Sequence, residues 1–243
     1  FGGAQRIYHL ARGLAQRHDV TILAPATRAE FDATLELGQI CDVVTVPASN
    51  TQRQPAGHRK RLQQVRAQVS SRSFAERSGY FAALEAAIAT IFQSSQVDLV
   101  QYETPSAALH HLPAPRPTVF DALNVEYQLL ERVARTSSST LQELFNRGEA
   151  VKLRRLERGR WRAATVVTAT SDIDAAVIEA ATGQHVPVVP NGVEIDLFAQ
   201  VRANQPVSHE IVFVGAMRHQ PNASGALWFA SEVLPRIAQK LPD

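Results

Sequence analysis

The sequence is poor in cysteine and has no long hydrophobic run, and each shortage excludes a class of protein. Cys41 is the single cysteine among 243 residues, which excludes an intramolecular disulfide and a cysteine-rich metal site and favours a reducing cytosol. The stretch closest to a membrane span, residues 81–92, is interrupted by Glu85 and is shorter than the roughly 18 apolar residues required. With 45% hydrophobic residues, the composition is that of a soluble globular protein with a buried core.

The net charge of +2 conceals two stretches in which cations are concentrated, residues 52–77 and 147–162. A solvated helix face, an anionic lipid surface and nucleic acid are the possible explanations. Aromatic residues are scarce among the cations, which argues against a single-stranded nucleic acid partner. We therefore expect that nucleic acid is not a partner. Peripheral contact with an anionic membrane is possible through the first stretch, by way of Arg59, Lys60, Arg61 and Arg66.

Short β-branched segments alternate with longer helical patterns along most of the chain. This alternation predicts an α/β fold with a Rossmann-like, doubly wound parallel sheet covered by helices on both faces. The expected strands are residues 19–24, 42–46, 97–102, 117–121, 165–168 and 186–189. The expected helices are residues 4–17, 28–37, 59–71, 80–94, 106–111, 127–163 with an interruption near 136–140, and 172–181.

A polar stretch then separates this first domain from a short second one. We expect a first domain over residues 1–192, a linker over 193–209, and one strand and one helix over 210–243. The strand is expected at residues 210–214 and the helix at 222–240. Units below about 40 residues rarely bury a core unaided, so we expect the chain to stop inside its second domain.

Five segments, spread over the whole chain, carry a family resemblance. They are GGAQRIYHLARGLAQRHDVTIL, FDALNVEYQLLER, VVTATSDID, VVPNGVEIDLF and FVGAMRHQPNASGALWFASEVLPRIAQKLPD. In this order they resemble the bacterial family 4 glycosyltransferases of the GT-B architecture. The resemblance implies two Rossmann-like domains facing each other across a cleft, with a nucleotide sugar bound mainly by the second. It also implies hexosyl transfer to a glycan, lipid-linked or small-molecule acceptor, with no metal and no other cofactor.

A glycine pair stands in front of the first helical pattern. Gly2 and Gly3 leave no Cβ in the way of an anion at the positive end of the helix, which makes them candidate phosphate contacts. A tight turn without a ligand is the alternative interpretation. The resemblance places this loop against the donor diphosphate and the acceptor, and it implies that the strand before the loop lies upstream of Phe1.

Other candidate residues follow predicted strands, at the sheet edge where ligands gather in open α/β folds. Asp121, Asn124 and Glu126 follow one strand, and the first two either contact the acceptor or cap the next helix. Asn191 and Gly192 follow another. They either form a β-turn that needs positive φ or mark the end of the first domain at the cleft, as a hinge or a ligand contact.

In the second domain, Gly215 ends the predicted strand, where its backbone can approach a phosphate. Many relatives place Arg and Lys where this chain has Ala216 and Asn222, so Arg218 is the nearest substitute cation, unless it is a solvated surface residue. Asn222 is expected to cap the helix. The resemblance puts the catalytic glutamate pair beyond Asp243, so the catalytic residues are unknown and the chain alone is expected to be inactive.

Two rival functions stay open at this point. One is a membrane-surface binding domain without catalysis, and the other is a sugar-nucleotide epimerase, which shares the GT-B fold. A metal site is not expected, because His110 and His111 are adjacent on the chain and no carboxylates follow at ligand spacing. The expected location is the cytoplasm, with possible contact to the inner face of the membrane.

Overall fold

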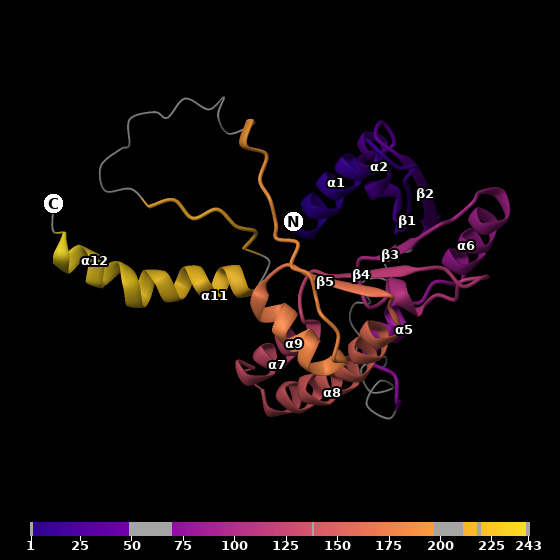
Figure 1. The fold of residues 1–243 in the computed structure, drawn as a ribbon. Helices are drawn as coiled ribbons and strands as arrows, with labels where there is room; N and C mark the ends of the chain where they lie inside the picture. The colour runs from indigo at the N-terminus through magenta and orange to yellow at the C-terminus, as the bar shows by residue number, and fades with distance from the viewer. Residues whose placement is uncertain (1, 49–69, 138, 197–210, 218–219, 242–243) are drawn as a thin grey trace. The chain divides into compact units, whose positions relative to one another are not determined.

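The computed structural model describes residues 2–48, 70–137, 139–196, 211–217 and 220–241 (Figure 1). The chain divides into two compact units, Phe1–Gly192 and Val193–Asp243. The predicted helix over residues 59–71 falls almost wholly outside the described residues.

Parallel strands form the centre of the first unit. β1 (Thr21–Ala26) pairs with β2 (Asp42–Pro47) in one sheet. A second sheet has the order β3-β4-β5, made of β3 (Val100–Tyr102), β4 (Thr118–Ala122) and β5 (Val166–Ala169). Every pairing is parallel, which requires crossover connections and confirms the predicted α/β class. The expected strand at 186–189 is reduced to a single parallel bridge between Val188 and Ala169.

Helices connect these strands, and their ends follow local sequence signals. The Ser73 hydroxyl and the Glu76 carboxylate form a capping box at the start of α5, and Gly183, with a φ of 73°, ends α9. The helices of the first unit are α1 (Gly2–Leu14), η1 (Arg28–Glu30), α2 (Phe31–Leu37), α5 (Phe74–Gly79), α6 (Ala82–Ser94), η2 (Ala107–Leu109), α7 (Glu126–Arg135), α8 (Thr140–Ala163) and α9 (Asp172–Thr182).

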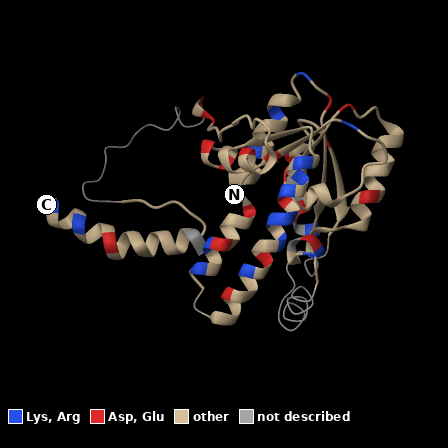
Figure 2. Ribbon diagram, turned by 60° about the horizontal axis from the view of Figure 1, so that its bottom comes forward, with Lys and Arg blue, Asp and Glu red and all other residues tan. Residues whose placement is uncertain are grey.

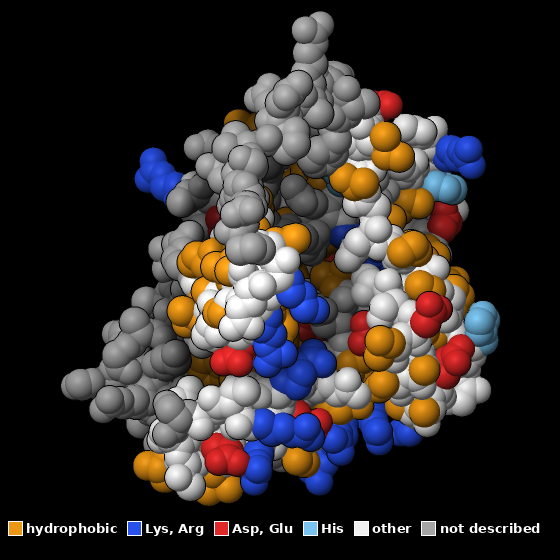
Figure 3. Space-filling model, turned by 90° about the vertical axis from the view of Figure 1, so that its left-hand side faces the viewer, with side chains coloured by type: hydrophobic (Ala, Val, Ile, Leu, Met, Phe, Trp, Pro, Cys, Tyr) orange, Lys and Arg blue, Asp and Glu red, His pale blue; other side chains and the backbone are white. Residues whose placement is uncertain are grey.

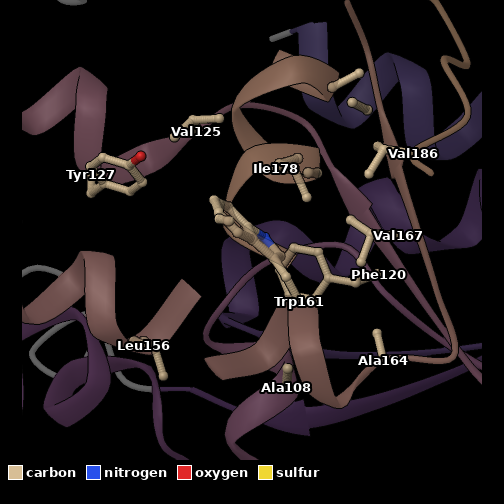
Figure 4. Packing of buried hydrophobic residues seen from close by; sticks show 14 of the residues in the cluster. Ala108, Phe120, Val125, Tyr127, Leu156, Trp161, Ala164, Val167, Ile178 and Val186 are labelled. Carbon is tan, nitrogen blue, oxygen red and sulfur yellow. The ribbon is translucent and has the colours of Figure 1, made fainter. Parts of the chain in front are cut away.

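The main core lies where α7, α8 and α9 cover one face of the three-stranded sheet (Figure 1). Trp161 of α8 and Ile178 of α9 are fully buried, and in Figure 4 they point toward Phe120 of β4. Burying a large apolar side chain contributes about 1.5 to 3 kcal/mol, so this cluster fixes the three helices on the sheet. A smaller cluster joins Val46 of β2 to Phe81 and Leu84 at the start of α6.

Helix α8 also carries two buried glutamates that cap other helices. The Glu157 carboxylate accepts hydrogen bonds from the backbone N–H groups of Glu126 (3.0 Å) and Tyr127 (2.8 Å), at the start of α7. Glu149 accepts one from the N–H of Phe74, at the start of α5. These carboxylates satisfy N–H groups that the helices leave free and oppose the positive ends of the helix dipoles. Burial raises the pKa of Glu157 to about 7.

The described part of the second unit is mainly helical. α11 (Gln220–Trp228), the π-helical turn η3 (Phe229–Val233) and α12 (Leu234–Lys240) follow one another without a break and confirm the predicted helix. The predicted strand at 210–214 is wrong where it is described, because residues 211–214 adopt no strand and Val214 is 91% exposed. A strand needs a neighbour to pair with, and no described segment of this unit supplies one.

Candidate functional site

A cavity of about 240 Å³ opens at the carboxyl ends of β3 and β4. We call it the β3–β4 pocket. Its polar wall comes from β4, the segments that follow β3 and β4, and the start of α7. Its apolar wall comes from β4, the segment after it and α8. The polar wall consists of Glu103, Thr104, Ser106, Asp121, Asn124 and Glu126, and the apolar wall includes Phe120, Leu123 and Leu153. Ligands of open α/β sheets bind at this edge, so the pocket is the candidate site of the first unit.

A buried ion pair lies at the edge of the pocket. Arg6 of α1 forms a bidentate ion pair with Asp121, with Nε 2.8 Å from Oδ2 and Nη2 3.0 Å from Oδ1. Arg6 is 7% exposed and Asp121 is 2% exposed. The Thr168 hydroxyl donates a further hydrogen bond to Asp121 Oδ1, over 2.6 Å. The hydrogen bonds to Asp121 raise the pKa of Arg6 against the opposing effect of burial, so Arg6 stays charged.

The same guanidinium connects a third segment to this pair. Arg6 Nη1 donates to the backbone carbonyl of Pro190 (3.2 Å) and to Asn191 Oδ1 (3.3 Å). Two of the residues selected from the sequence, Asp121 and Asn191, are thus brought together by an arginine that sequence reasoning missed. A signal was present, because Arg6 lies four residues before Leu10 and places a charge beside the apolar stripe of the helix.

Asp121 and Asn124 do not cap the following helix, contrary to one of the two interpretations of the sequence. The N-cap of α7 is Val125, and the N–H groups of its first turn are bound by Glu157 instead. Both Asp121 oxygens are already occupied by Arg6 and Thr168. Asn124 is exposed and lines the pocket.

The glycine pair lies inside α1 rather than in a loop before it. Glycine readily adopts helical angles, and the helix begins at Gly2, two residues earlier than predicted. A Cβ at Gly3 would lie 3.2 Å from Leu123 Cδ1, so the glycine permits close packing of α1 against the pocket wall. The β-turn that was one interpretation of Asn191 and Gly192 is not formed, and Gly183 is the one glycine with positive φ among the described residues.

Two carboxyl groups of the pocket wall, those of Glu103 and Glu126, form no salt bridge with any described residue. Glu103 Oε1 accepts a hydrogen bond from Gln101 Nε2 (2.6 Å), whereas Oε2 is buried without a hydrogen-bond partner among the described residues. Glu126 is bound by the Asn124 side chain. Burial raises the pKa values of both Glu103 and Glu126 above the usual range for glutamate. Burial thus favours the neutral form of both carboxyl groups, whose oxygens line the pocket as possible hydrogen-bond acceptors.

Comparison with known proteins identifies the family of this chain. Residues 2–197 match the model of Glycosyltransferase Family 4, which covers the first unit and the beginning of the second. The chain belongs to glycosyltransferase family 4. No curated protein and no solved structure matches it. Family membership confirms the resemblance and, with the parallel sheets, the Rossmann-like GT-B fold class.

In the second unit of this family 4 glycosyltransferase, Gly215 lies in a crowded position. A Cβ there would stand 2.9 Å from Phe213 Cε1 and 3.1 Å from Asn222 Nδ2. Asn222 is not the helix N-cap that was expected, because α11 already begins at Gln220 and the Asn222 amide donates to the Ala216 carbonyl (3.3 Å). Arg218 lies outside the described residues, as do Arg59, Lys60, Arg61 and Arg66.

The histidine pair of the glycosyltransferase has a structural role at His110. Its ring is buried, Nε2 accepts from the Phe81 N–H (3.1 Å), Nδ1 lies 3.2 Å from the Ala107 carbonyl, and the ring stacks on Tyr80. Among the described residues, no group of three or more His, Cys, Asp or Glu side chains is arranged to hold a metal ion. None of the helices in the described part of the chain is both long and apolar enough to cross a membrane.

Proposed function

We propose that this protein takes part in hexosyl transfer from a nucleotide sugar to a hydroxyl of a glycan, lipid-linked or small-molecule acceptor, as in polysaccharide biosynthesis. The first unit then holds the acceptor in the β3–β4 pocket. One observation carries the proposal beyond the family. Arg6 ties the start of α1, the end of β4 and the segment at Asn191 to one another at the edge of this pocket.

The groups proposed to face the donor diphosphate are backbone N–H groups. Gly2 and Gly3 belong to the first turn of α1, whose free N–H groups and positive dipole end attract anions. Asn191, which the Arg6 side chain contacts, and Gly192 after it are the other proposed contacts from the first unit. Gly215 and Arg218 are the proposed contacts from the second unit. Stabilising the departing diphosphate is the main requirement of such a transfer, because electrostatic stabilisation is usually the largest catalytic contribution. We propose that it proceeds without a metal.

We further propose that this chain by itself does not catalyse transfer. None of the described residues of the second unit is buried, so these residues form no enclosed donor pocket. Two or three neutral hydrogen bonds at about 1 kcal/mol each support at best about millimolar affinity.

The test of function compares this chain with the full product of its gene, whatever the length of that product, both supplied with radiolabelled UDP-, GDP- and ADP-hexoses and an extract of membrane lipids and glycans. We expect label transfer by the full product, unaffected by EDTA, and none by this chain. Absence of transfer and of donor hydrolysis in the full product would refute the glycosyltransferase proposal. Transfer by the chain alone would refute the proposed inactivity.

A second candidate function is contact with an anionic membrane surface, and the outer face of α8 favours it. Leu144, Arg147, Val151 and Arg155 recur at helical spacing on this face, and all are exposed. Figure 2 shows cations spread along the helices, and Figure 3 shows a face on which Lys and Arg side chains gather beside hydrophobic ones. Mixed basic and apolar helix faces bind lipid interfaces.

Liposome cosedimentation tests this contact. We expect recovery of the protein with vesicles that contain phosphatidylglycerol, loss of recovery at 0.5 M NaCl, and weaker binding by Arg155→Glu, in about the range of 1 kcal/mol per cation. Equal recovery with neutral phosphatidylcholine vesicles would contradict an electrostatic contact.

A further inference from the structure

A second cavity of the first unit, of about 420 Å³, lies between the end of α8 and the segment that joins β3 to β4. We call it the Arg160 pocket. We infer that it binds a phosphate monoester through the side chains of Arg160, Tyr102 and His111, which all line it. This inference goes beyond the proposed function and does not depend on it.

The Arg160 pocket is separate from the β3–β4 pocket. Thr118, the first residue of β4, lines the Arg160 pocket, whereas Asp121 and Ala122, the last two, line the β3–β4 pocket. Of the described residues that line the two cavities, none is shared. Substrate sites of open α/β sheets lie at the carboxyl ends of the strands, so the Arg160 pocket is an additional site.

The first argument is that the Arg160 guanidinium is available to a ligand. Arg160 belongs to the second basic stretch of the sequence and lies half-buried in the last turn of α8. Within the described part of the chain it has no hydrogen bond or salt bridge, and none of its nitrogen atoms is shut off from solvent. A guanidinium presents its N–H groups in a fork that fits two oxygens of a phosphate.

The second argument is that two further donors line the same pocket. The hydroxyl of Tyr102, at the end of β3, has no hydrogen-bond partner among the described residues and is accessible to solvent. Burial raises the pKa of this hydroxyl and the charge of Arg160 opposes the rise, which indicates that the two side chains lie near each other. His111 is exposed, and its imidazole can donate a hydrogen bond in either protonation state. Donors from three segments match the three terminal oxygens of a phosphate monoester better than the two oxygens of a carboxylate.

The third argument is the charge around the Arg160 pocket. Among the described residues that line it, none is acidic. Glu85 is a carboxylate that interacts with His111, but its two oxygens already accept hydrogen bonds from the Tyr80 hydroxyl (2.8 Å) and the His111 backbone N–H (3.1 Å). The positive charge of Arg160 therefore dominates the lining, and an anion gains an opposite charge there.

The remaining lining indicates an organic phosphate. Leu109, Leu112 and Ala163 supply apolar surface for a carbon skeleton. The buried His110 ring is part of the wall and not a ligand group, because both of its nitrogens are engaged, by the Phe81 N–H and the Ala107 carbonyl. The volume of about 420 Å³ is within the range of roughly 300 to 1,000 Å³ that is usual for small-molecule sites.

Saturation-transfer difference NMR on the full chain at pH 7.5 tests the inference. The probe is glycerol 3-phosphate, with glycerol as its neutral counterpart and glycerate as its carboxylate counterpart. We expect glycerol 3-phosphate to bind saturably with a Kd of about 1 mM or lower, to be displaced by orthophosphate, and to bind at least fivefold more tightly than glycerate. Glycerol should not bind.

Variants of the lining connect this binding to the pocket. Arg160→Gln should weaken glycerol 3-phosphate at least tenfold, and Arg160→Lys less, because lysine keeps the charge but loses the fork. Tyr102→Phe should weaken it about threefold while it keeps the ring. The matched control is Arg135→Gln, which removes an exposed arginine from the last turn of α7, outside both pockets, and should leave the affinity unchanged.

Thermal unfolding verifies folding, and Arg160→Gln should unfold at the temperature of the parent, since Arg160 has no partner to lose among the described residues. No saturable binding of glycerol 3-phosphate, no displacement by orthophosphate, equal or tighter binding of glycerol or glycerate, or unchanged affinity in Arg160→Gln would each overturn the inference. An equal loss in Arg135→Gln would do the same, because it would show unspecific attraction to cations.

A vesicle experiment distinguishes two sources of the phosphate monoester. The protein is sedimented with vesicles that contain phosphatidate or phosphatidylglycerol, matched in surface charge. Greater recovery with phosphatidate that Arg160→Gln abolishes would identify a lipid headgroup as the ligand of the pocket. Equal recovery with both lipids, together with binding of glycerol 3-phosphate, would identify a soluble metabolite.

Discussion

The ion pair between Arg6 and Asp121 should be the most sensitive single contact of the first unit. Arg6→Met removes the cation and leaves the Asp121 carboxylate, which is 2% exposed, with the Thr168 hydroxyl as its remaining hydrogen-bond donor. Breaking a buried pair in this way costs about 3 to 5 kcal/mol, because a buried charge loses its partner. The contacts to Pro190 and Asn191 are lost as well. This is a large part of the about 5 to 15 kcal/mol by which a native domain is stable.

Urea unfolding followed by tryptophan fluorescence measures this loss. A Trp228→Phe background leaves Trp161, which is fully buried in the main core, as the reporter of the first unit. With a denaturant dependence of about 2 kcal/mol per molar urea, the midpoint should fall by about 1.5 to 2.5 M. The matched control is Arg147→Met, which breaks the exposed pair of Arg147 with Glu143 and should cost less than about 1 kcal/mol.

A double variant distinguishes a lost ion pair from lost packing. Arg6→Met combined with Asp121→Leu removes both charges, and replacing a whole buried pair by apolar groups is often neutral. We expect the double variant to recover at least half of the stability lost in Arg6→Met. If Arg6→Met costs less than about 1 kcal/mol, or if the double variant is no more stable than the single one, the pair does not hold the three segments together.

Two further predictions concern residues that support the pocket. Burial raises the pKa of Glu157 from its usual 4.5 to about 7, so the folded state holds this proton more tightly than the unfolded state. The protonated Glu157 side chain should contribute about 3 kcal/mol at most to the free energy of unfolding, fully below pH 4.5, and this contribution should be lost as the pH rises through 7. The difference in urea midpoint between the parent and Glu157→Gln should change over the same pH range. A Cβ at Gly79 would lie 2.5 Å from Ser106 Oγ and 2.6 Å from Ser106 Cβ, so Gly79→Ala should destabilise by about 1 to 3 kcal/mol, and Ser106→Gly should rescue it. Calorimetry checks both variants, and a gain of about 1 kcal/mol in Gly79→Ala, as helix propensity alone predicts, would contradict the steric argument.

The elements that the sequence predicts well are those that depend on local interactions. β4 was expected at residues 117–121 and lies at Thr118–Ala122, and α9 was expected at 172–181 and lies at Asp172–Thr182. Alternating apolar periods and caps such as Ser171 and Gly183 determine these bounds within a few residues. The parallel α/β class follows from the order of the elements alone.

Contacts between distant residues were not predictable in the same way. Arg6 and Asp121 are 115 residues apart, and no local pattern pairs them. The cap of α7 was sought among its neighbours Asp121 and Asn124, but it comes from Glu157, which is 31 residues beyond Glu126. Both contacts depend on which helices pack next to each other on the sheet. A single sequence does not indicate which distant segments become neighbours.

The second unit shows the same division between local and distant interactions. Residues 211–214 are apolar, and three of the four are β-branched, but strand hydrogen bonds require a partner segment, and β propensity mainly reflects packing against neighbours. The helix at 222–240 forms because its hydrogen bonds close within four residues. Gly215 lies between these two segments. Its proposed approach to a phosphate therefore depends on residues 211–214, whose conformation local interactions do not fix. The residues of the first unit therefore give the sharper test of the site, because Arg6 and Asp121 are joined by hydrogen bonds of 2.8 and 3.0 Å and Glu103 is bound by Gln101 over 2.6 Å, all within one unit.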